Sequence, residues 1–430
     1  MQTVSLKGSG VKAGSLKRVA KMRALFLAFV SVLMPALAGA RDPVDLYAAA
    51  DAARNNEFAL ALYRGLSREE AGKNLFFSPL SIRMALAMVY AGARGETAKQ
   101  MNRVLGFPMQ EEKLHRVMQG LVPDRNRGAG GQATFRLDVA NSIWASQHTQ
   151  FQKEFLNIGD TYYGAKPRTL DFGRSEHARE TINRWVEEKT QDKIKDLIPH
   201  GAIDYLTRMV LANAVYFKAQ WGNQFKETAT KKETFFAPMG ERPGVPMMQQ
   251  EARGFGYFED RSVQVLEMPY MEGIASMVVI LPRDRKNGLA AMEKKLNAAS
   301  LRSWMDRLEY REVKVIFPKF KTTQTLALKH RLISLGIKDA FIHGRADFSA
   351  MNGKNDLYLS AVFHQAFVDV DEKGTEAAAS TAVRVTKAAY TRPEKQPPVF
   401  RADRPFLYLI RLRSSGNILF LGRLNDPTAG

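Results

Sequence analysis

The stretch VDVDEKGTEAAASTAVRV, residues 368–385, decides how this sequence can fold. Read with a period of two from Thr375, one set of side chains is small or β-branched and uncharged, whereas the other set contains Glu376 and Arg384. This alternation is typical of a β-strand with one buried face. The uncharged set is Thr375, Ala377, Ala379, Thr381, Val383 and Val385.

The same stretch also has the features of an exposed loop. It contains Gly374, where the backbone can turn freely, and it leads into residues 391–398, TRPEKQPP, which are polar and interrupted by proline. Small side chains anchor a strand poorly, because they bury little apolar surface. We therefore interpret the stretch as a loop in one state and a strand in another. The alternative is an edge strand or an alanine-rich helix beside a loop.

Helical patterns dominate the first half of the chain and strand patterns the second half. No polar, turn-rich linker divides the chain, so we expect one large α+β domain. The expected helices are 44–67, 81–93, 101–105, 111–121 and 177–198, and the expected strands are 133–145, 209–219, 263–269, 276–281, 312–317, 361–370, 406–413 and 418–423.

The first forty residues differ from the rest of the chain. Six basic residues and no acidic residue occur up to an apolar run at 24–33, and the small residues ALAGA follow at 36–40. This is the order of a secretory signal, and the run is shorter than the roughly 20 residues that span a bilayer. We therefore divide the chain into a leader, residues 1–40, and a domain, residues 41–430. We expect a secreted protein with no membrane span after the leader is removed.

The leader leaves other interpretations open. Its basic part is longer than usual, so translation can also begin at Met22. A basic amphipathic targeting peptide or a membrane anchor is the alternative to a secretory signal. After export, the compartment is either the extracellular space or the periplasm.

The composition excludes several classes of site. The sequence has no cysteine, which excludes disulfides, thiol catalysis and cysteine-based zinc sites. It also lacks the G-x-S-x-G, H-E-x-x-H and G-x-G-x-x-G motifs, so we expect no enzyme, no cofactor and no metal. The net charge of +19 makes a polyanion, such as a heparin-like glycan or nucleic acid, a candidate partner. Because the basic residues are scattered, a solvated basic surface is the simpler interpretation.

Six ordered segments between residues 44 and 425 resemble the serpin family. They correspond to the start of the family's second helix, a central strand, a further core strand, the strand and hinge before the reactive loop, and two parts of the C-terminal signature. The segments are NLFFSPLSI at 74–82, LANAVYFKAQW at 211–221, FPKF at 317–320, HQAFVDVDEKGTEAAA at 364–379, FRADRPF at 400–406 and GNILFLGR at 416–423.

The resemblance implies a single α+β serpin-type domain, with about nine helices packed on three β-sheets and an exposed reactive-centre loop at about 372–400. It implies a monomer that inhibits a serine endopeptidase. In such inhibitors the peptidase forms an acyl-enzyme at the loop, and the cut loop then inserts into the central sheet and traps the peptidase. The alternative within the family is a non-inhibitory binding or chaperone-like serpin.

The resemblance also implies a hinge whose small residues match the inhibitory pattern. Family spacing from Gly374 places the reactive bond between Ala388 and Ala389, which suits an elastase-like peptidase, and the neighbouring Lys387 would suit a trypsin-like one. The hinge residues are Glu372, Gly374, Thr375, Glu376, Ala377, Ala378, Ala379, Ser380 and Thr381.

Two further groups of residues carry over from the resemblance. The first is a polar cluster beneath the point where the sheet opens, namely Ser78, Ser81, Asn213 and His364. The second lies where the loop enters the sheet, namely Trp221, Lys319 and Glu372. A Glu372–Lys319 ion pair there would tie the hinge to its neighbouring strand.

Overall fold

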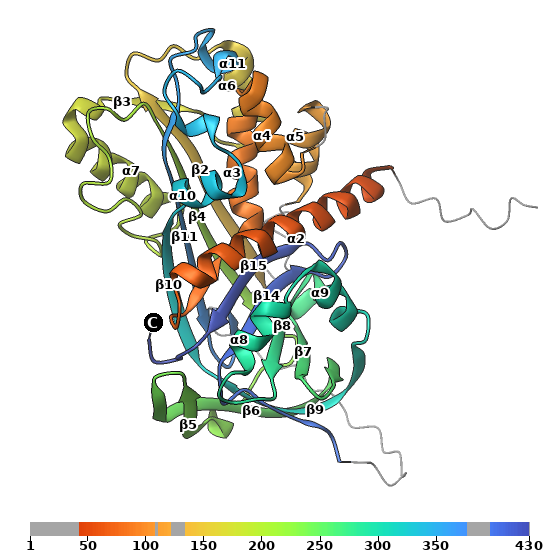
Figure 1. Cartoon of the computed structure of the whole chain (residues 1–430). Coiled ribbons are helices and arrows are strands. Elements are labelled where there is room, and N and C mark those ends of the chain that lie inside the picture. The colour runs from red at the N-terminus through yellow and green to blue at the C-terminus, as the bar shows by residue number, and fades with distance from the viewer. Residues whose placement is uncertain (1–42, 108–110, 122–133, 376–395, 430) are drawn as a thin grey trace, which may run out of the picture. The chain divides into compact units, whose positions relative to one another are not determined.

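The structure is a computed structural model that describes residues 43–107, 111–121, 134–375 and 396–429. The chain divides into two units, residues 1–47 and 48–430, and the described part of the first unit is the beginning of helix α2. Ten α-helices occur in the described residues (Figure 1). They are α2 (Pro43–Glu69), α3 (Pro79–Ala91), α4 (Gly95–Leu105), α5 (Glu111–Gly120), α6 (Lys153–Tyr163), α7 (Ser175–Lys189), α8 (Gly288–Lys295), α9 (Ala298–Met305), α10 (Lys329–Leu335) and α11 (Ser349–Asn352).

The strands of the described residues form two sheets, and the expected α+β class is confirmed. The six-stranded sheet has the order β10-β11-β12-β4-β2-β3, and the nine-stranded sheet has the order β1-β15-β14-β8-β7-β6-β9-β13 with β5 paired to β6. The strands are β1 (Leu75–Phe77), β2 (Phe135–Ser146), β3 (Arg168–Leu170), β4 (Met209–Gln220), β5 (Lys231–Ala237), β6 (Gly240–Glu259), β7 (Val263–Pro269), β8 (Ala275–Pro282), β9 (Glu309–Pro318), β10 (Phe320–Ala327), β11 (Leu359–Val370), β12 (Gly374–Thr375), β13 (Val399–Arg401), β14 (Phe406–Leu412) and β15 (Ile418–Leu424).

The expected number of three sheets differs from this arrangement, and strand β6 is the reason. Its first half pairs with β5 and with the end of β9, and its second half pairs with β7 and with the start of β9. The register of β6 on β9 shifts between Ala252 and Phe255, where an irregularity bends the strand without ending the ladder. One continuous strand therefore joins into a single sheet what we expected as two.

The six-stranded sheet lies between two layers of helix, and each face carries its own core. Alternate residues of β4, such as Leu211 and Val215, belong to the main core, which includes buried α3. The intervening residues, such as Ala212 and Ala214, pack with α7 in a second, smaller core. Figure 1 shows α7 and α3 on opposite sides of this sheet. Any strand added to this sheet would therefore be buried on both faces.

Helix α3 begins with a sequence signal that the structure explains. Ser78 is its N-cap and accepts a hydrogen bond from Ser81 N at 3.1 Å, and Pro79 occupies the first helical position. Proline there costs nothing, since the first N–H groups of a helix have no partner within it. This cap fixes Ser78 and Ser81 beneath the six-stranded sheet.

The helix expected at 177–198 is shorter in the structure. Helix α7 ends at Lys189, and Gln191, Asp192 and Asp196 all have positive φ angles. A right-handed helix cannot continue through such residues. Ile194 and Leu197 lie beyond the end of the helix and are fully buried in the second core. Their burial explains why the apolar pattern in the sequence extends past Lys189.

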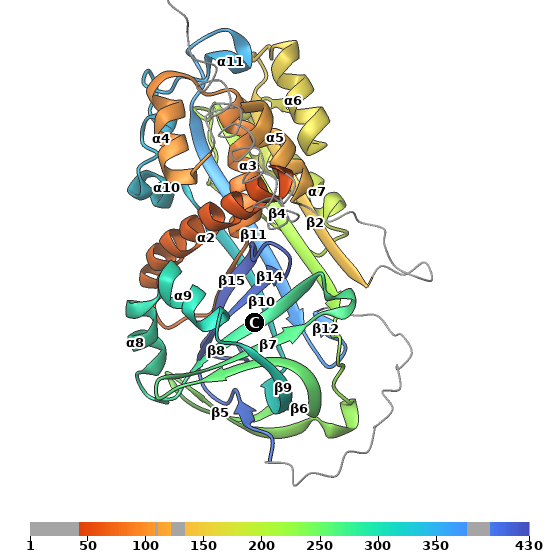
Figure 2. The same ribbon diagram turned by 90° about the vertical axis from the view of Figure 1, so that its right-hand side faces the viewer.

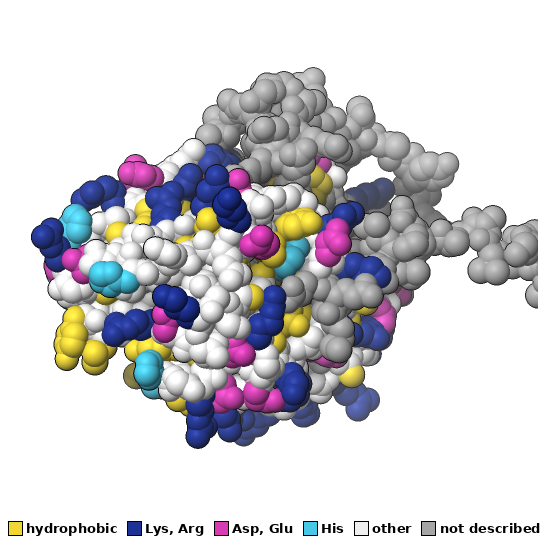
Figure 3. All heavy atoms as spheres, turned by 90° about the horizontal axis from the view of Figure 1, so that it is seen from above, with side chains coloured by type: hydrophobic (Ala, Val, Ile, Leu, Met, Phe, Trp, Pro, Cys, Tyr) yellow, Lys and Arg dark blue, Asp and Glu magenta, His cyan; other side chains and the backbone are white. Residues whose placement is uncertain are grey.

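One face of the molecule carries its basic residues in a dispersed pattern (Figure 3). On the face shown in Figure 3, lysine and arginine side chains alternate with acidic ones rather than gathering in one patch. The polyanion partner stays a prediction. Across the described residues, no helix is long and apolar enough to cross a membrane.

Candidate functional site

The centre of the six-stranded sheet contains one parallel seam. Strands β4 and β11 pair in parallel from Met209–Leu359 to Tyr216–Phe367, whereas the long flanking pairs β10–β11 and β2–β4 are antiparallel. An antiparallel strand placed between β4 and β11 would therefore pair antiparallel with both. Parallel pairing is slightly weaker per residue than antiparallel pairing, so the β4–β11 seam is weaker per residue than the two antiparallel pairs that flank it.

The short strand β12 already occupies one end of this seam (Figure 2). Gly374 and Thr375 pair antiparallel with Gln220 and Ala219 of β4, and Thr375 also pairs with Val370 of β11. The predicted hinge thus begins as a strand between the two parallel strands. The rest of the predicted hinge, residues 376–381, and the predicted reactive bond, residues 387–389, lie outside the described residues.

Gly374 is required here by close approach of the backbone. A Cβ atom at this position would lie 2.1 Å from Ala219 O and 2.7 Å from Gln220 Cα. Both atoms belong to the backbone of β4 and cannot rotate away. A larger residue would therefore push the start of β12 out of the seam.

An aromatic stack buries the first side chain of β12. Trp221 and Tyr270 lie parallel with ring centroids 4.7 Å apart, and Trp221 Nε1 donates to Asp371 O at 2.9 Å. The Tyr270 hydroxyl and Thr375 Oγ1 are 2.8 Å apart, and Thr375 is fully buried. Trp221 therefore lies beside the start of β12, and Tyr270 supplies a contact that the sequence did not indicate.

The carboxylate of Glu372 anchors the chain just before β12. Its Oε2 accepts from Lys319 Nζ at 2.8 Å and its Oε1 accepts from Thr230 Oγ1 at 2.7 Å. Burial alone would raise the pKa of Glu372, but these two hydrogen bonds and the Lys319 charge hold that pKa below its usual range. The residue pair expected from the sequence is therefore close in space, with Thr230 as an additional partner.

The four residues of the predicted polar cluster lie together beneath the seam. His364 on β11 and Asn213 on β4 face each other directly across it, with His364 Nδ1 and Asn213 Oδ1 2.5 Å apart. Asn213 Nδ2 donates to Ser81 Oγ at 2.5 Å and to Asn141 Oδ1 of β2. The cluster therefore links β11, β4, β2 and helix α3, and its central bond crosses the seam.

The hydrogen bonds of His364 fix its protonation state. Nε2 accepts from the backbone N–H of Ser78 at 3.1 Å, so Nε2 carries no proton and Nδ1–H donates to Asn213. Burial lowers the pKa of His364 to about 3. A second proton on Nε2 would oppose the Ser78 N–H, so the hydrogen bond from Ser78 requires neutral histidine.

Ser78 completes the support of the cluster from below. Its Oγ donates to Leu419 O of β15 at 2.6 Å and accepts from Ser81 N. Both serines are buried at the start of α3. The polar cluster is thus held by the helix cap and by the nine-stranded sheet.

A buried polar atom lies on the opposite face of the seam. Gln365 on β11 faces α7, and its Nε2 donates to Lys195 O at 3.2 Å. Its Oε1 is buried and accepts no hydrogen bond from any described residue. A buried acceptor that forms no hydrogen bond destabilises the fold, because it has lost its hydrogen bonds to water. No described residue of the protein replaces those hydrogen bonds for Gln365 Oε1.

Sequence reasoning missed three contributors to the site: Asn141, Thr230 and Tyr270. Asn141 could have been found, since it is a polar residue inside an expected strand and faces Asn213 in the β2–β4 register. Thr230 and Tyr270 follow strands β4 and β7, and nothing local in their sequence marks their contact with the hinge. No group of three or more potential metal ligands occurs in the described part of the chain.

Comparisons with known proteins agree with this geometry. Residues 53–427 match the family described as Serpin (serine protease inhibitor). The human leukocyte elastase inhibitor is 40% identical over 380 residues, which cover 87% of this chain and 98% of that protein. Among solved structures, Serpin48 of the insect Tenebrio molitor is similar, with a TM-score of 0.77 and 32% identity; the match covers 87% of this chain and 98% of that one. Human thyroxine-binding globulin in complex with thyroxine is also similar, with a TM-score of 0.79 and 31% identity; the match covers 88% of this chain and 99% of that one.

The comparisons contradict the prediction that the protein is secreted. The 380 matched residues take up 98% of the human leukocyte elastase inhibitor, so that relative has no room for a counterpart of a forty-residue leader. The relatives therefore point away from secretion, and the predicted localisation is wrong. The basic and apolar pattern of residues 1–40 lies outside the described residues, and the division at residue 40 stays a prediction.

Proposed function

The chain belongs to the serpin family, whose members are described as serine protease inhibitors, and on this premise we propose that it traps a serine endopeptidase by inserting its cleaved loop into the β4–β11 seam. The observation that carries the proposal is β12, which begins a strand antiparallel to both β4 and β11. The proposal requires the residues after Thr375 to continue that strand.

The register of β12 defines which residues would fill the seam. Thr375 faces Ala219 on β4 and Val370 on β11, and each further step along the loop is one step back along both strands. On this register the end of β4, Met209, faces Val385, and the start of β11, Leu359, faces Thr386. The inserted strand would therefore be residues 375–386, and the reactive bond would follow just beyond the edge of the sheet.

The same register assigns a face to every inserted side chain. Directly opposed residues of paired strands point to the same face, and Ala219 belongs to the main core. Residues 375, 377, 379, 381, 383 and 385 would thus enter the main core. These are the small, uncharged residues of the alternating pattern, whereas Glu376 and Arg384 fall on the α7 side near the two ends of the strand.

Two inserted residues would meet the polar atoms of the seam. Thr381 falls opposite both Asn213 and His364, so its hydroxyl can replace the bond that these two residues make in the closed sheet. Ser380 falls opposite Gln365, whose Oε1 has no donor among the described residues. Insertion would therefore separate a polar pair without leaving either member unpaired, and it would also supply the missing donor.

The energetics favour the filled seam. Insertion replaces one parallel ladder by two antiparallel ladders and buries a strand on both faces. Each additional hydrogen bond contributes about 1 kcal/mol net, and each buried methylene about 0.8 kcal/mol. Summed over a strand of this length, these contributions reach the order of 10 kcal/mol, which is comparable to the stability of a whole domain. The intact loop keeps the molecule from this state until it is cut.

The target is proposed from the loop sequence and from the relatives. A bond between Ala388 and Ala389 presents a small residue, which fits the shallow specificity pocket of an elastase-like peptidase. The relatives named leukocyte elastase inhibitors support this choice. Cleavage after Lys387 by a trypsin-like peptidase is the second candidate, because an acidic pocket would pair with its ammonium group.

The decisive experiment is incubation of the full chain with pancreatic elastase and, separately, with trypsin. We expect a covalent complex that survives SDS, and loop-cleaved protein with a higher melting temperature than the intact protein. Substitution Ala379→Glu, which would place a carboxylate in the main core, should give cleavage without complex and without the rise in melting temperature. The matched substitution Thr391→Glu lies beyond the register and should preserve both. Complex formation by the Ala379→Glu variant would contradict the register.

A non-inhibitory binding function is the second candidate. It is favoured by the similarity to thyroxine-binding globulin, whose structure was solved with thyroxine bound. A chain of this kind would be cleaved in the loop by elastase without forming a complex and without becoming harder to melt. The same experiment therefore separates the two candidates.

A further inference from the structure

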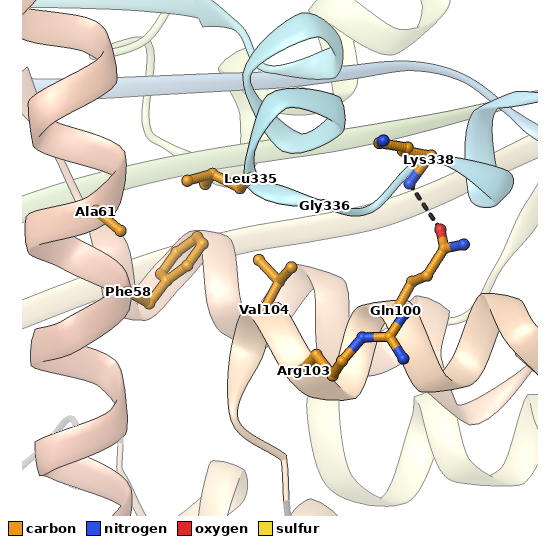
Figure 4. A pocket seen from close by; sticks show the side chains of 8 residues that line it. All are labelled: Phe58, Ala61, Gln100, Arg103, Val104, Leu335, Gly336 and Lys338. Atoms are coloured by element: carbon orange, nitrogen blue, oxygen red, sulfur yellow. Dashed lines mark hydrogen bonds between the residues drawn. The ribbon is translucent and has the colours of Figure 1, made fainter.

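A groove lies between helices α2, α4 and α10, away from the seam (Figure 4). Its volume is about 590 Å³, which falls in the range of small-molecule sites. Eight residues line the groove, and they come from three segments that are far apart in the sequence. They are Phe58, Ala61, Gln100, Arg103, Val104, Leu335, Gly336 and Lys338.

The floor of the groove is apolar. Phe58 is only 2% exposed, and Val104 and Leu335 pack against the main core. Figure 4 shows these three side chains pointing toward one another across the space. Gly336 ends α10 at a φ of 119°, which favours glycine, and a Cβ there would lie 3.3 Å from Val104 Cγ2. The wall therefore stays open at this point.

One rim of the groove is polar and positively charged. Gln100 Oε1 accepts from the backbone N–H groups of Lys338 and Asp339 at 2.8 and 2.9 Å, which ties the segment after α10 to α4. Arg103 and Lys338 both line the groove, and none of the eight lining residues is acidic. Arg103 is paired with Glu96 at 2.8 Å, whereas Lys338 forms no ion pair within the described residues.

We propose that this groove binds a small amphiphilic anion, with an aliphatic chain on the Phe58–Val104–Leu335 floor and a carboxylate beside Lys338. The apolar floor would remove the chain from water, and the ammonium group of Lys338 would pair with the head group. Charge complementarity selects an anion over a neutral amphiphile. The site is independent of any action on peptidases, since none of its residues belongs to β4, β11 or β12.

Calorimetric titration of the full chain with decanoate, below the concentration at which it forms micelles, tests the proposal. We expect one saturable site, with decanol, the neutral analogue, binding more weakly. Ala61→Leu fills the groove and should weaken decanoate binding more than tenfold. Lys338→Gln should weaken decanoate binding about two- to fivefold and leave decanol unchanged, as expected for a partly exposed ion pair.

Ala53→Leu provides the matched control. Ala53 lies on the same helix but lines a separate groove of about 320 Å³ together with α9 residues, so this substitution should leave decanoate binding intact. Melting temperatures show whether each variant folds. If Ala61→Leu does not fold, Lys338→Gln, at an exposed position, still tests the proposal. Absence of a saturable site, equal binding of decanol and decanoate, or loss of binding in Ala53→Leu alone would overturn the proposal.

Discussion

His364 makes the stability of the closed seam depend on pH. Its pKa in the folded protein is about 3, against about 6.5 for an unperturbed histidine. A histidine with a lowered pKa contributes stability above its unfolded pKa, and that stability is lost as the pH falls toward the folded pKa. The folded state should therefore lose stability relative to the unfolded chain below about pH 6.5, while the bond between His364 and Asn213 persists until the pH approaches the folded pKa.

We predict that lowering the pH from 7 to 5 reduces the free energy of unfolding by about 1–2 kcal/mol through this residue. Thermal melting at both pH values measures the effect, and His364→Gln should show a smaller dependence on pH than the native chain. The exposed His148 serves as the control, because His148→Gln should leave the dependence unchanged. An equal pH slope in His364→Gln and the native chain would contradict the assignment.

The second residue-scale prediction concerns Glu372. Glu372→Gln removes the charge that Lys319 and Thr230 hold, and we expect it to lower the free energy of unfolding by about 1 kcal/mol at pH 7. The value is modest because the Lys319 side chain is 39% exposed and therefore partly screened by solvent.

At low pH, Glu372→Gln and the native chain should have the same free energy of unfolding. The pKa of Glu372 is lowered, so its contribution exists above the ordinary glutamate pKa of about 4.3 and disappears as the pH falls below it. Urea unfolding at pH 7 and at low pH measures this. Glu227→Gln is the control, since its carboxylate is 71% exposed and 3.7 Å from Lys373. A constant difference at all pH values would mean that the carboxylate charge is not involved.

At the scale of elements, strand β15 shows how closely the sheets pack. A Cβ on Gly422 would lie 2.5 Å from Leu75 O of β1 and 2.8 Å from Tyr408 Cζ of β14. We predict that Gly422→Ala lowers the free energy of unfolding by about 1–3 kcal/mol, because the neighbouring backbone would have to move. Gly120→Ala, at the end of α5 with nothing within 4 Å, should be neutral or slightly stabilising, and equal effects in the two variants would refute the packing argument.

The sequence predicted the elements whose pattern is local. Strands β4, β11, β14 and β15 are rich in apolar and β-branched residues, and Ser78-Pro79 marks the start of α3. Strand β6 was not expected, because glycine and proline interrupt its pattern and its pairing partners β5, β7 and β9 hold it extended. Tertiary pairing overrode local propensity there.

The candidate site was predictable only where its pattern is local in the sequence. The uncharged face of residues 375–385 appears in the sequence as an alternation. We propose that this face enters the main core, because its first member, Thr375, pairs with Ala219 of that core. The parallel direction of β4 and β11 could not be derived from the residues, since strand direction depends on how the chain returns between them. Contacts such as Tyr270 with Thr375 join positions 105 residues apart and leave no local signal.

At the scale of the whole molecule, the proposal predicts that the seam accepts a strand from solution. A synthetic peptide of residues 376–386, incubated with the intact chain, should raise the melting temperature and prevent formation of the covalent complex with elastase. The peptide would take the place of the chain's own loop in the register that β12 begins. A peptide of scrambled order is the control. An unchanged melting temperature with the native-order peptide would count against a seam that opens.

The parallel pairing of β4 and β11 has a consequence for handling the protein. Backbone pairing recognises strand direction and small side chains, and it does not distinguish which copy of the chain supplies them. A molecule's own loop is present at a fixed local concentration, whereas loops of other molecules become more abundant as the solution is concentrated. Warming a concentrated sample should consequently link copies head to tail into fibres, and dilution should protect them.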